Sequence, residues 1–354
     1  MTNVYEQLAH HLDRMPGGFP STDVGVELRI LKRLFTPREA EIALHLLLKP
    51  ETASTIAARV GMDPDELSPI LEDMSKKGLI LRSSKGKELL FMAAQFMIGI
   101  WEYHVNDLDE GLIRDFNEYV PHLVEKTWAK QRTRQLRVIP VSTSIKAEVS
   151  VMPYEAAEKI IEGQSKIVVA PCICRKEHNM IGEGCDKPME ACLIFGGSAY
   201  YYEENGLGRT VSKEEALEIL SQGMASGLVL QPGNSQKPSN ICMCCGCCCQ
   251  ILKNIKTFDR PAELVCTSYF AEVEAENCTA CGECAAICQM AAIDVDDVAV
   301  VEKERCIGCG LCVSVCEYDA VRVLQKSKPK QWVPPRNLVE TYMKIAQERM
   351  QQNP

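Results

Sequence analysis

Eight of the nineteen cysteines lie in two runs with the same spacing, C-x2-C-x2-C-x3-C. The first run holds Cys278, Cys281, Cys284 and Cys288, and the second holds Cys306, Cys309, Cys312 and Cys316. Three thiolates at this spacing can bind one face of a cubane, and the small residues between them let backbone amides approach its sulfides. Zinc sites usually take two cysteine pairs separated by a longer loop. The spacing therefore favours iron–sulfur clusters over zinc sites or a disulfide framework.

The segment around these runs, about residues 266–324, resembles the two-cluster bacterial ferredoxins. The resemblance includes the hydrophobic pair after each fourth cysteine, Ala292-Ile293 and Ala320-Val321. In such ferredoxins the fourth cysteine of each run binds the other cluster. The resemblance thus implies two [4Fe-4S] clusters, the first held by Cys278, Cys281, Cys284 and Cys316 and the second by Cys306, Cys309, Cys312 and Cys288. The sequence departs from the ferredoxins after each fourth cysteine, where Gln289 and Glu317 replace the usual proline.

Ten further cysteines lie upstream in three clumps, and Cys266 stands apart from them. The clumps are Cys172 and Cys174; Cys185 and Cys192; and Cys242, Cys244, Cys245, Cys247, Cys248 and Cys249. We expect at least one additional iron–sulfur cluster here, of the [4Fe-4S] type. Its expected ligands are Cys172, Cys174, Cys185 and Cys192, or a mixture of these with the 242–249 run. The count also allows two clusters, and such clumps suit zinc or copper thiolate sites as well.

The order of the clumps resembles a family of uncharacterised anaerobe iron–sulfur proteins with a 4Fe-4S dicluster ferredoxin domain. The matching motifs are CxCR at 172–175, C-x-x-P-x-E-x-C-L at 185–193 and CxCCxCCC at 242–249. This resemblance implies iron–sulfur binding and no particular reaction. The CCG triplet at 244–246 is similar to cysteine-rich domains of heterodisulfide reductases, whose repeat spacing is absent here. Arg175 and Lys176 either offset cluster charge or are surface cations, and His178 is either a ligand or a hydrogen-bonding group.

Before the cysteines, helix signals begin near Glu27. Thr36 and Asp63 are N-cap residues, each followed by proline at the first helical position, and Thr52 begins a short helix between them. Two strands follow, around a turn at Ser83–Lys87. Three helices and a hairpin over about residues 27–95 resemble the winged helix domains of transcription regulators. However, residues 36–95 carry eight basic and nine acidic residues, and DNA readers normally show a basic face. We therefore expect this module to dock protein or to dimerise, with no nucleic acid as its partner.

These signals predict a multidomain α+β protein. The expected domains are a winged helix domain (1–95), a helical linker broken at Pro121 (96–135), a Cys-rich α/β iron–sulfur domain (136–265), a two-cluster ferredoxin-like domain (266–324), and a C-terminal arm and helix (325–354). In the third domain, strands are expected at 136–141 and 165–172, and helices after Pro153 and Ser212.

The composition predicts a cytoplasmic protein of a reducing, anaerobic cell. Clumped cysteines cannot easily staple distant segments, no signal peptide is visible in the polar N-terminus, and the most apolar stretch, 89–101, is too short for membrane insertion. The net charge is −9, and residues 266–324 carry eleven acidic and three basic residues. This excess is either a solubilising surface or a docking face for a basic redox partner.

Together the motifs predict an electron-transfer protein that relays single low-potential electrons to or from a partner redox enzyme. The alternatives are a redox enzyme with a reactive cluster in the Cys-rich domain, served by His178 or Tyr200–Tyr202 as proton donors, a redox-sensing winged helix regulator, and a thiolate metal store. No G-x-G-x-x-G or Walker pattern indicates nucleotide chemistry. A homodimer is compatible with the winged helix resemblance.

Overall fold

A computed structural model describes residues 3–144 and 152–352. The chain divides into two compact units: residues 1–130 with 200–207, and residues 131–199 with 208–354. The second unit contains every cysteine of the chain. Among the described helices, none combines the length and the apolar character that crossing a bilayer requires.

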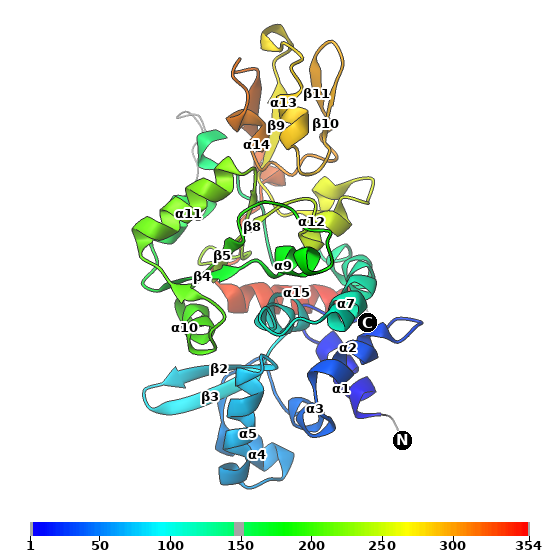
Figure 1. Cartoon of the computed structure of the whole chain (residues 1–354), viewed down its shortest axis with the longest axis vertical. Coiled ribbons are helices and arrows are strands. Elements are labelled where there is room, and N and C mark those ends of the chain that lie inside the picture. The colour runs from blue at the N-terminus through cyan, green and yellow to red at the C-terminus, as the bar shows by residue number, and fades with distance from the viewer. Residues whose placement is uncertain (1–2, 145–151, 353–354) are drawn as a thin grey trace. The chain divides into compact units, whose positions relative to one another are not determined.

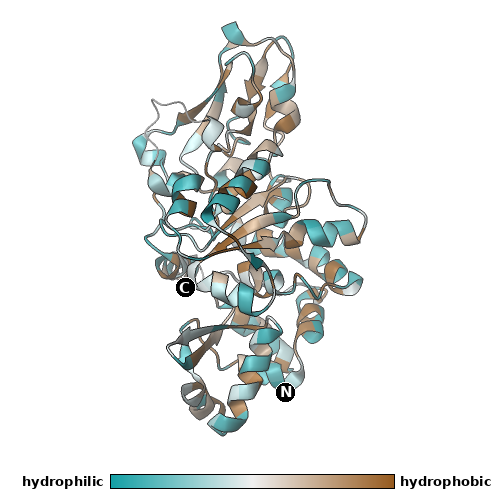
Figure 2. Cartoon of the chain, turned by 60° about the vertical axis from the view of Figure 1, so that its left-hand side comes forward, coloured by the Kyte–Doolittle hydropathy of each residue, from teal (hydrophilic) through white to brown (hydrophobic). Residues whose placement is uncertain are grey.

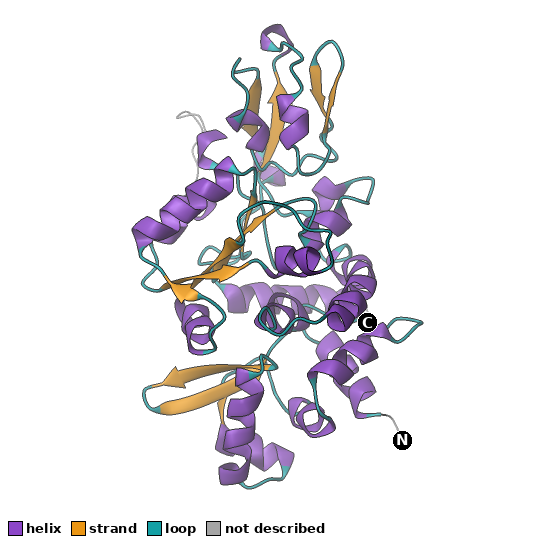
Figure 3. Cartoon of the chain, viewed as in Figure 1, coloured by secondary structure: helices purple, strands orange, loops and turns teal. Residues whose placement is uncertain are grey.

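The first unit is mainly helical, with one small sheet (Figure 3). Its elements are α1 (Val4–Asp13), α2 (Val26–Leu34), α3 (Pro37–Ala43), β1 (Glu51–Thr52), α4 (Ala53–Val60), α5 (Pro64–Lys76), β2 (Ile80–Lys85), β3 (Glu88–Ala93), the π-turn Phe96–Ile100, α6 (Trp101–Tyr103), α7 (Glu110–Leu123) and the π-turn Val124–Trp128. The predicted caps are present: Thr36, Thr52 and Asp63 each accept a backbone N–H of the helix that follows. The predicted hairpin is also present as β2 and β3, with β1 pairing on β3.

The predicted order of three helices followed by a hairpin is thus present as α3, α4, α5, β2 and β3, and the assignment of this part as a winged helix domain stays a prediction. The predicted break at Pro121 is wrong, because α7 runs through this residue. Proline leaves the carbonyl four residues earlier without its helical donor. Here the helix widens into a π-turn directly afterwards, at Val124–Trp128, and the buried face of α7 holds it against α2.

The second unit is built on a five-stranded sheet with the order β6-β4-β5-β8-β7. Figure 1 labels β4, β5 and β8 of this sheet. The sheet and its helices are α8 (Ala157–Glu162), β4 (Ile167–Pro171), α9 (Ile173–Met180), β5 (Glu190–Phe195), β6 (Arg209–Thr210), α11 (Lys213–Ala225), β7 (Val229–Pro232), β8 (Asn240–Cys244) and α12 (Gln250–Ile255), while α10 (Gly196–Glu204) passes from this unit to the other. Every pairing in the sheet is antiparallel. The alternation of helices and strands predicts an α/β domain, and such domains usually have a parallel sheet. The helices and strands do alternate, but the sheet is antiparallel throughout, which corrects the parallel arrangement that this class implies. The predicted strand at 136–141 makes only two isolated bridges, at Leu136 and Ile139.

The two faces of this sheet have different partners. A Cβ on Gly223 of α11 would lie 2.4 Å from the sulfur of Met243, so Met243 faces α11. Successive residues of a strand point to opposite faces, so Cys242 and Cys244 face away from α11. Figure 2 shows the strands as the brown, hydrophobic centre of this unit. The cysteine face of β8 is therefore buried without being purely apolar.

The C-terminal part of the second unit contains two small sheets and two short helices. Its elements are β9 (Tyr269–Val273), α13 (Glu283–Ile287), β10 (Ile293–Val295), β11 (Ala299–Val301), α14 (Leu311–Ser314) and β12 (Val321–Gln325), in the pairs β9–β12 and β10–β11. The chain then extends to α15 (Leu338–Gln352). The arm and helix pack on their own unit: Trp332 donates to Asn234 over 2.7 Å, and Ile345 is fully buried.

Candidate metal centres

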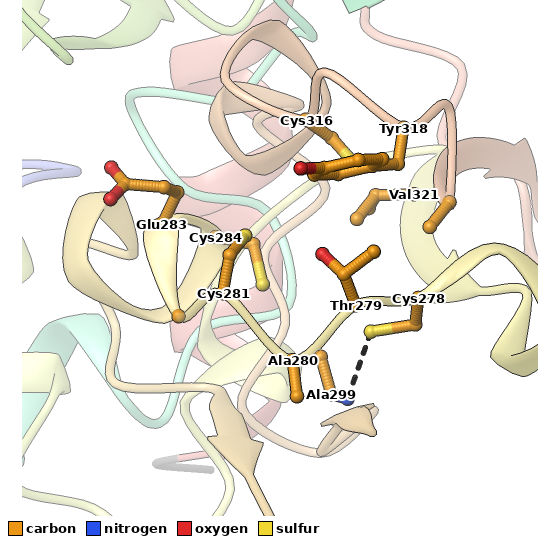
Figure 4. A pocket seen from close by; sticks show the side chains of 12 residues that line it. Cys278, Thr279, Ala280, Cys281, Glu283, Cys284, Ala299, Cys316, Tyr318 and Val321 are labelled. Atoms are coloured by element: carbon orange, nitrogen blue, oxygen red, sulfur yellow. Dashed lines mark hydrogen bonds between the residues drawn. The ribbon is translucent and has the colours of Figure 1, made fainter. Parts of the chain in front are cut away.

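Four cysteines line a hollow between α13 and the end of the second cysteine run: Cys278, Cys281, Cys284 and Cys316. Its empty volume is about 330 Å³, including solvent at its mouth. Figure 4 shows the ring of Tyr318 beside Cys316 and the carboxylate of Glu283 turned away from the thiols. The backbone N–H of Ala299 donates to Cys278 Sγ over 3.3 Å. The hollow thus brings together the three nearby thiols and the distant fourth one that the ferredoxin resemblance implies for a single cluster.

A second hollow of about 370 Å³ has the reciprocal set of thiols, Cys288, Cys306, Cys309 and Cys312. Backbone amides again point at sulfur: Ala271 N–H donates to Cys306 Sγ and Ala292 N–H donates to Cys288 Sγ, each over 3.3 Å. Amide donors at cysteine sulfur are characteristic of iron–sulfur sites, where they tune the potential. Both hollows therefore offer the donor set and the hydrogen bonds that a [4Fe-4S] cluster needs.

The two cysteine runs share backbone as well as spacing. Left-handed conformations recur at equivalent positions, in the pairs Ala280 and Gly308, Gly282 and Gly310, and Ala291 and Asp319. At Gly308 a Cβ would lie 2.3 Å from the Tyr269 carbonyl oxygen, so only glycine fits. The repeated turns hold consecutive thiols on one side of each loop.

Burial disfavours thiolate anions in the second hollow while no metal is bound. It raises the pKa of Cys309 to about 12 and also raises the pKa values of Cys306 and Cys312. Because metals bind thiolates, loading this hollow must release protons.

The upstream cysteines form two groups. The four-thiol group consists of Cys185, Cys245, Cys247 and Cys248, whose sulfur atoms all lie within 4.8 Å of one another. Cys248 Sγ lies 3.6 Å from Cys185 Sγ and 3.7 Å from Cys247 Sγ. Cys247 is exposed and Cys245 is buried, so the group reaches from the interior to the surface. Four convergent thiols are the ligand set of a cubane cluster or of a structural zinc.

The six-thiol group consists of the remaining upstream cysteines except Cys266. Its sulfur atoms form a continuous series of contacts in the order Cys172, Cys174, Cys249, Cys244, Cys242 and Cys192. The sheet explains part of this convergence, because Cys192 of β5 lies directly opposite Cys242 of β8. Cys172 follows β4 at the N-cap of α9, and Cys249 is the N-cap residue of α12. A hydrogen bond donated by the Cys174 thiol lowers the pKa of Cys172 to about 7, and the thiols of Cys174 and Cys244 lower the pKa of Cys249 well below its ordinary value.

A buried arginine lies beside both groups. Arg175 is fully buried and donates to the carbonyls of Pro188 and Met243. Burial alone would lower its pKa, but the neighbouring sulfurs of Cys172 and Cys245 raise it. Its Nε has no hydrogen-bond partner among the described residues. Arg175 is therefore not a surface cation, and a buried cation here can offset the negative charge of thiolates. That it offsets the charge of a cluster stays a prediction.

His178 and Tyr201, two of the side chains that the enzyme alternative would use as proton donors, are already hydrogen-bonded to other parts of the protein. His178 is buried, with Nδ1 2.8 Å from the Cys174 carbonyl and Nε2 3.0 Å from Lys253 Nζ. The Tyr201 hydroxyl donates to the carbonyls of Ser75 and Ile80 within the first unit. His178 is therefore the hydrogen-bonding group of the two alternatives, and the Tyr201 proton is already engaged.

A direct link joins the upstream cysteines to the ferredoxin-like part. The side chain of Gln289, directly after Cys288, accepts the N–H of Gly246 over 2.7 Å, and its amide donates to the Ile287 carbonyl over 3.0 Å. A Cβ on Gly246 would lie 2.2 Å from the Gln289 carbonyl oxygen. Gln289 thus supplies a side-chain acceptor that a proline could not, and the close approach of the two backbones leaves no room for a Cβ at position 246.

The sequence left two ligand sets open for an upstream cluster: cysteines 172, 174, 185 and 192, or a mixture of these with the 242–249 run. Cys172, Cys174 and Cys192 come together, but Cys185 lies with the 245–248 cysteines, so the upstream groups follow the mixed alternative. Sequence reasoning missed the roles of Gln289 and Gly246; the missing proline after Cys288 was the available signal.

Comparison with known proteins agrees with the C-terminal geometry. Residues 277–320 match the family model described as the 4Fe-4S dicluster domain. No curated protein and no solved structure gave a significant match. The match, the two four-thiol hollows and the amide donors on their sulfurs identify this part of the chain as a ferredoxin-type 4Fe-4S dicluster domain in an iron–sulfur protein.

Proposed function

We propose that the protein is an electron relay in which the dicluster domain exchanges single electrons with a further cluster on the four-thiol group. The observation that carries this proposal is the Gly246–Gln289 contact. It joins the loop that contains Cys245, Cys247 and Cys248 to the residue after Cys288, which is expected to bind a ferredoxin cluster. Clusters of this type accept and release one electron at a time, and the contact makes the two sites neighbours.

The chain's own residues set the conditions for this relay. Backbone amides donate to Cys278, Cys288 and Cys306, and such hydrogen bonds to sulfur raise a cluster's potential. The acidic residues of segment 266–324 act in the opposite direction, because negative charge disfavours the reduced state. Cys247 and Cys281 are exposed, which gives electrons a short route to the surface at both the four-thiol group and the dicluster domain.

The proposed partner is a redox protein with a basic docking face, since residues 266–324 carry eleven acidic and three basic residues. Complementary charge accelerates encounters and loses effect as salt screens it. We expect transfer from the reduced protein to a basic probe, such as a small cationic haem protein, to slow steeply with ionic strength. Transfer to an acidic flavoprotein of similar potential is expected to stay slow at low salt.

The relay is tested by counting electrons. The full-length protein, purified without oxygen, would be titrated with dithionite and followed by EPR. The variant Cys247→Ser/Cys248→Ser should take up one electron fewer than the parent, with the ferredoxin signals retained and their relaxation slowed by the loss of a neighbouring spin. Cys266→Ser is the matched control, because Cys266 belongs to neither group, and it should take up the parental number. Equal uptake by the double variant and the parent would refute the upstream cluster.

A further inference from the structure

The proposed relay uses the dicluster domain and the four-thiol group, and it gives no role to the six cysteines of the six-thiol group. Its members come from four separate segments: the start of α9, strand β5, strand β8 and the N-cap of α12. Packed protein cores have no general need for six adjacent thiols, and no disulfide links any of them. This concentration of thiols is better explained by a bound metal or cluster than by packing.

Hydrogen-bond donors converge on these sulfur atoms. The amide of Asn240 lies 3.4 Å from Cys242 Sγ, and the amide of Gln231 lies 3.8 Å from Cys249 Sγ. Backbone N–H groups at the start of α12 also donate to Cys249, and the backbone N–H of Arg175 donates to Cys172. Gln231 and Asn240 are buried polar residues, so their placement costs free energy unless they find acceptors. Thiolate or metal-bound sulfur is a much better acceptor than a neutral thiol.

Charge points to the same conclusion. Arg175 is fully buried, and its Nε is unpartnered among the described residues. No carboxylate forms an ion pair with it in the described chain. A buried guanidinium without a carboxylate needs another anion. The sulfurs beside it are those of Cys172, in the six-thiol group, and Cys245, in the four-thiol group.

We propose that the six-thiol group binds a second upstream iron–sulfur cluster, distinct from the one on the four-thiol group and held by more cysteines than a cubane requires. Sulfur-only ligation favours iron–sulfur or zinc over hard cations. The amide donors and the chain's commitment to iron–sulfur chemistry favour iron–sulfur. This inference rests on the proposed function for the type of cluster, iron–sulfur. The six-thiol group and the four-thiol group are different sets of cysteines, so each can be tested on its own.

Three full-length variants test the proposal, each made without oxygen, labelled with ⁵⁷Fe and analysed for iron, sulfide and zinc together with Mössbauer spectra. Cys192→Ser/Cys242→Ser removes a facing pair from the six-thiol group, Cys247→Ser/Cys248→Ser removes two ligands of the four-thiol group, and Cys266→Ser is the control. The parent should contain about sixteen irons or more, counting four per cluster. Each double variant should lose about four or more, with different Mössbauer components disappearing, while the control keeps the parental content.

The outcomes separate this proposal from the proposed function. If only Cys247→Ser/Cys248→Ser lowers the iron content, the relay stands and the six-thiol cluster is refuted. If the parent has about eight irons and neither double variant changes this, both fail. Zinc lost from Cys192→Ser/Cys242→Ser with iron unchanged also overturns the iron–sulfur assignment.

One further variant keeps every thiol, so that the test does not depend on whether the cysteine variants fold. Asn240→Leu removes the donor to Cys242 and should lower the potential of one component while the ferredoxin components stay in place. Unchanged potentials throughout in this variant would also count against the proposal.

Discussion

Replacing Gln289 with alanine should loosen the loop 244–249 without touching a cysteine. The change removes the acceptor of the Gly246 N–H. A hydrogen bond of this kind is worth about 1 kcal/mol, and leaving a buried donor unsatisfied costs up to about 3 kcal/mol. Gly246 is buried, so the expected cost spans this range. It corresponds to a local opening that is about 5- to 150-fold more populated.

Hydrogen exchange measured by mass spectrometry reads this opening directly, because exchange of a protected amide follows the opening free energy. The peptide that contains Gly246 should exchange faster in Gln289→Ala by about that factor, while peptides of β4 and β5 keep their rates. Glu317→Ala is the matched control: Glu317 is the equivalent residue of the second run and is exposed. Exchange at Gly246 that is the same in Gln289→Ala and the parent would refute the reasoning, whatever metals the protein holds.

Three further expectations can be checked in the same protein. Gly246→Ala places a Cβ 2.2 Å from the Gln289 carbonyl oxygen and should lower the free energy of unfolding by about 1–3 kcal/mol in a denaturant titration. The control is Gly197→Ala, which has no atom within 4 Å of its Cβ and should leave the free energy of unfolding unchanged. Equal effects of the two changes would show that the contact at Gly246 is not tight. Burial lowers the pKa of His104 against the opposing effect of its hydrogen bond to a backbone carbonyl. The unfolded chain therefore binds a proton at His104 more strongly than the folded chain does, and the stability should fall as the pH drops below about 6.5, by at most about 1.4 kcal/mol per pH unit. The melting temperature of His104→Gln should fall less between pH 7.5 and pH 5.5 than that of the parent. The segment 36–95 should select no consensus from random DNA duplexes, and a sequence bound with a dissociation constant of about 10⁻⁸ M or tighter at physiological salt would contradict this.

Local signals in the sequence predicted the elements that depend on a few neighbouring residues. The caps at Thr36 and Asp63 satisfy backbone groups within one helical turn, so they can be read from the sequence alone. The spacing of each ferredoxin run is equally local, and the matching family model covers it. The break predicted at Pro121 failed because packing of α7 against α2 outweighs the cost of one lost hydrogen bond.

The division of the upstream cysteines depends on distant pairings, and spacing could not supply it. Cys192 meets Cys242 only through the register of two antiparallel strands, and a shift of one residue would turn Cys242 toward α11. Cys185 joins Cys245 and Cys248 through a loop that has no periodic pattern. The role of Gln289 was likewise hidden, because its partner lies 43 residues earlier in the chain.

The segment 242–249, which begins in β8, gives its thiols to both upstream groups in an interleaved order. Cys242 and Cys244 belong to the six-thiol group, the next three cysteines belong to the four-thiol group, and Cys249 returns to the first. Ordering each residue of such a segment costs about 1–2 kcal/mol of conformational entropy. If both groups bind clusters as proposed, the first cluster to form bears most of this cost and leaves the second site already assembled. Metal uptake by the apoprotein would then be cooperative, so that half-loaded molecules are scarce during biogenesis and oxidative damage to one centre exposes the other.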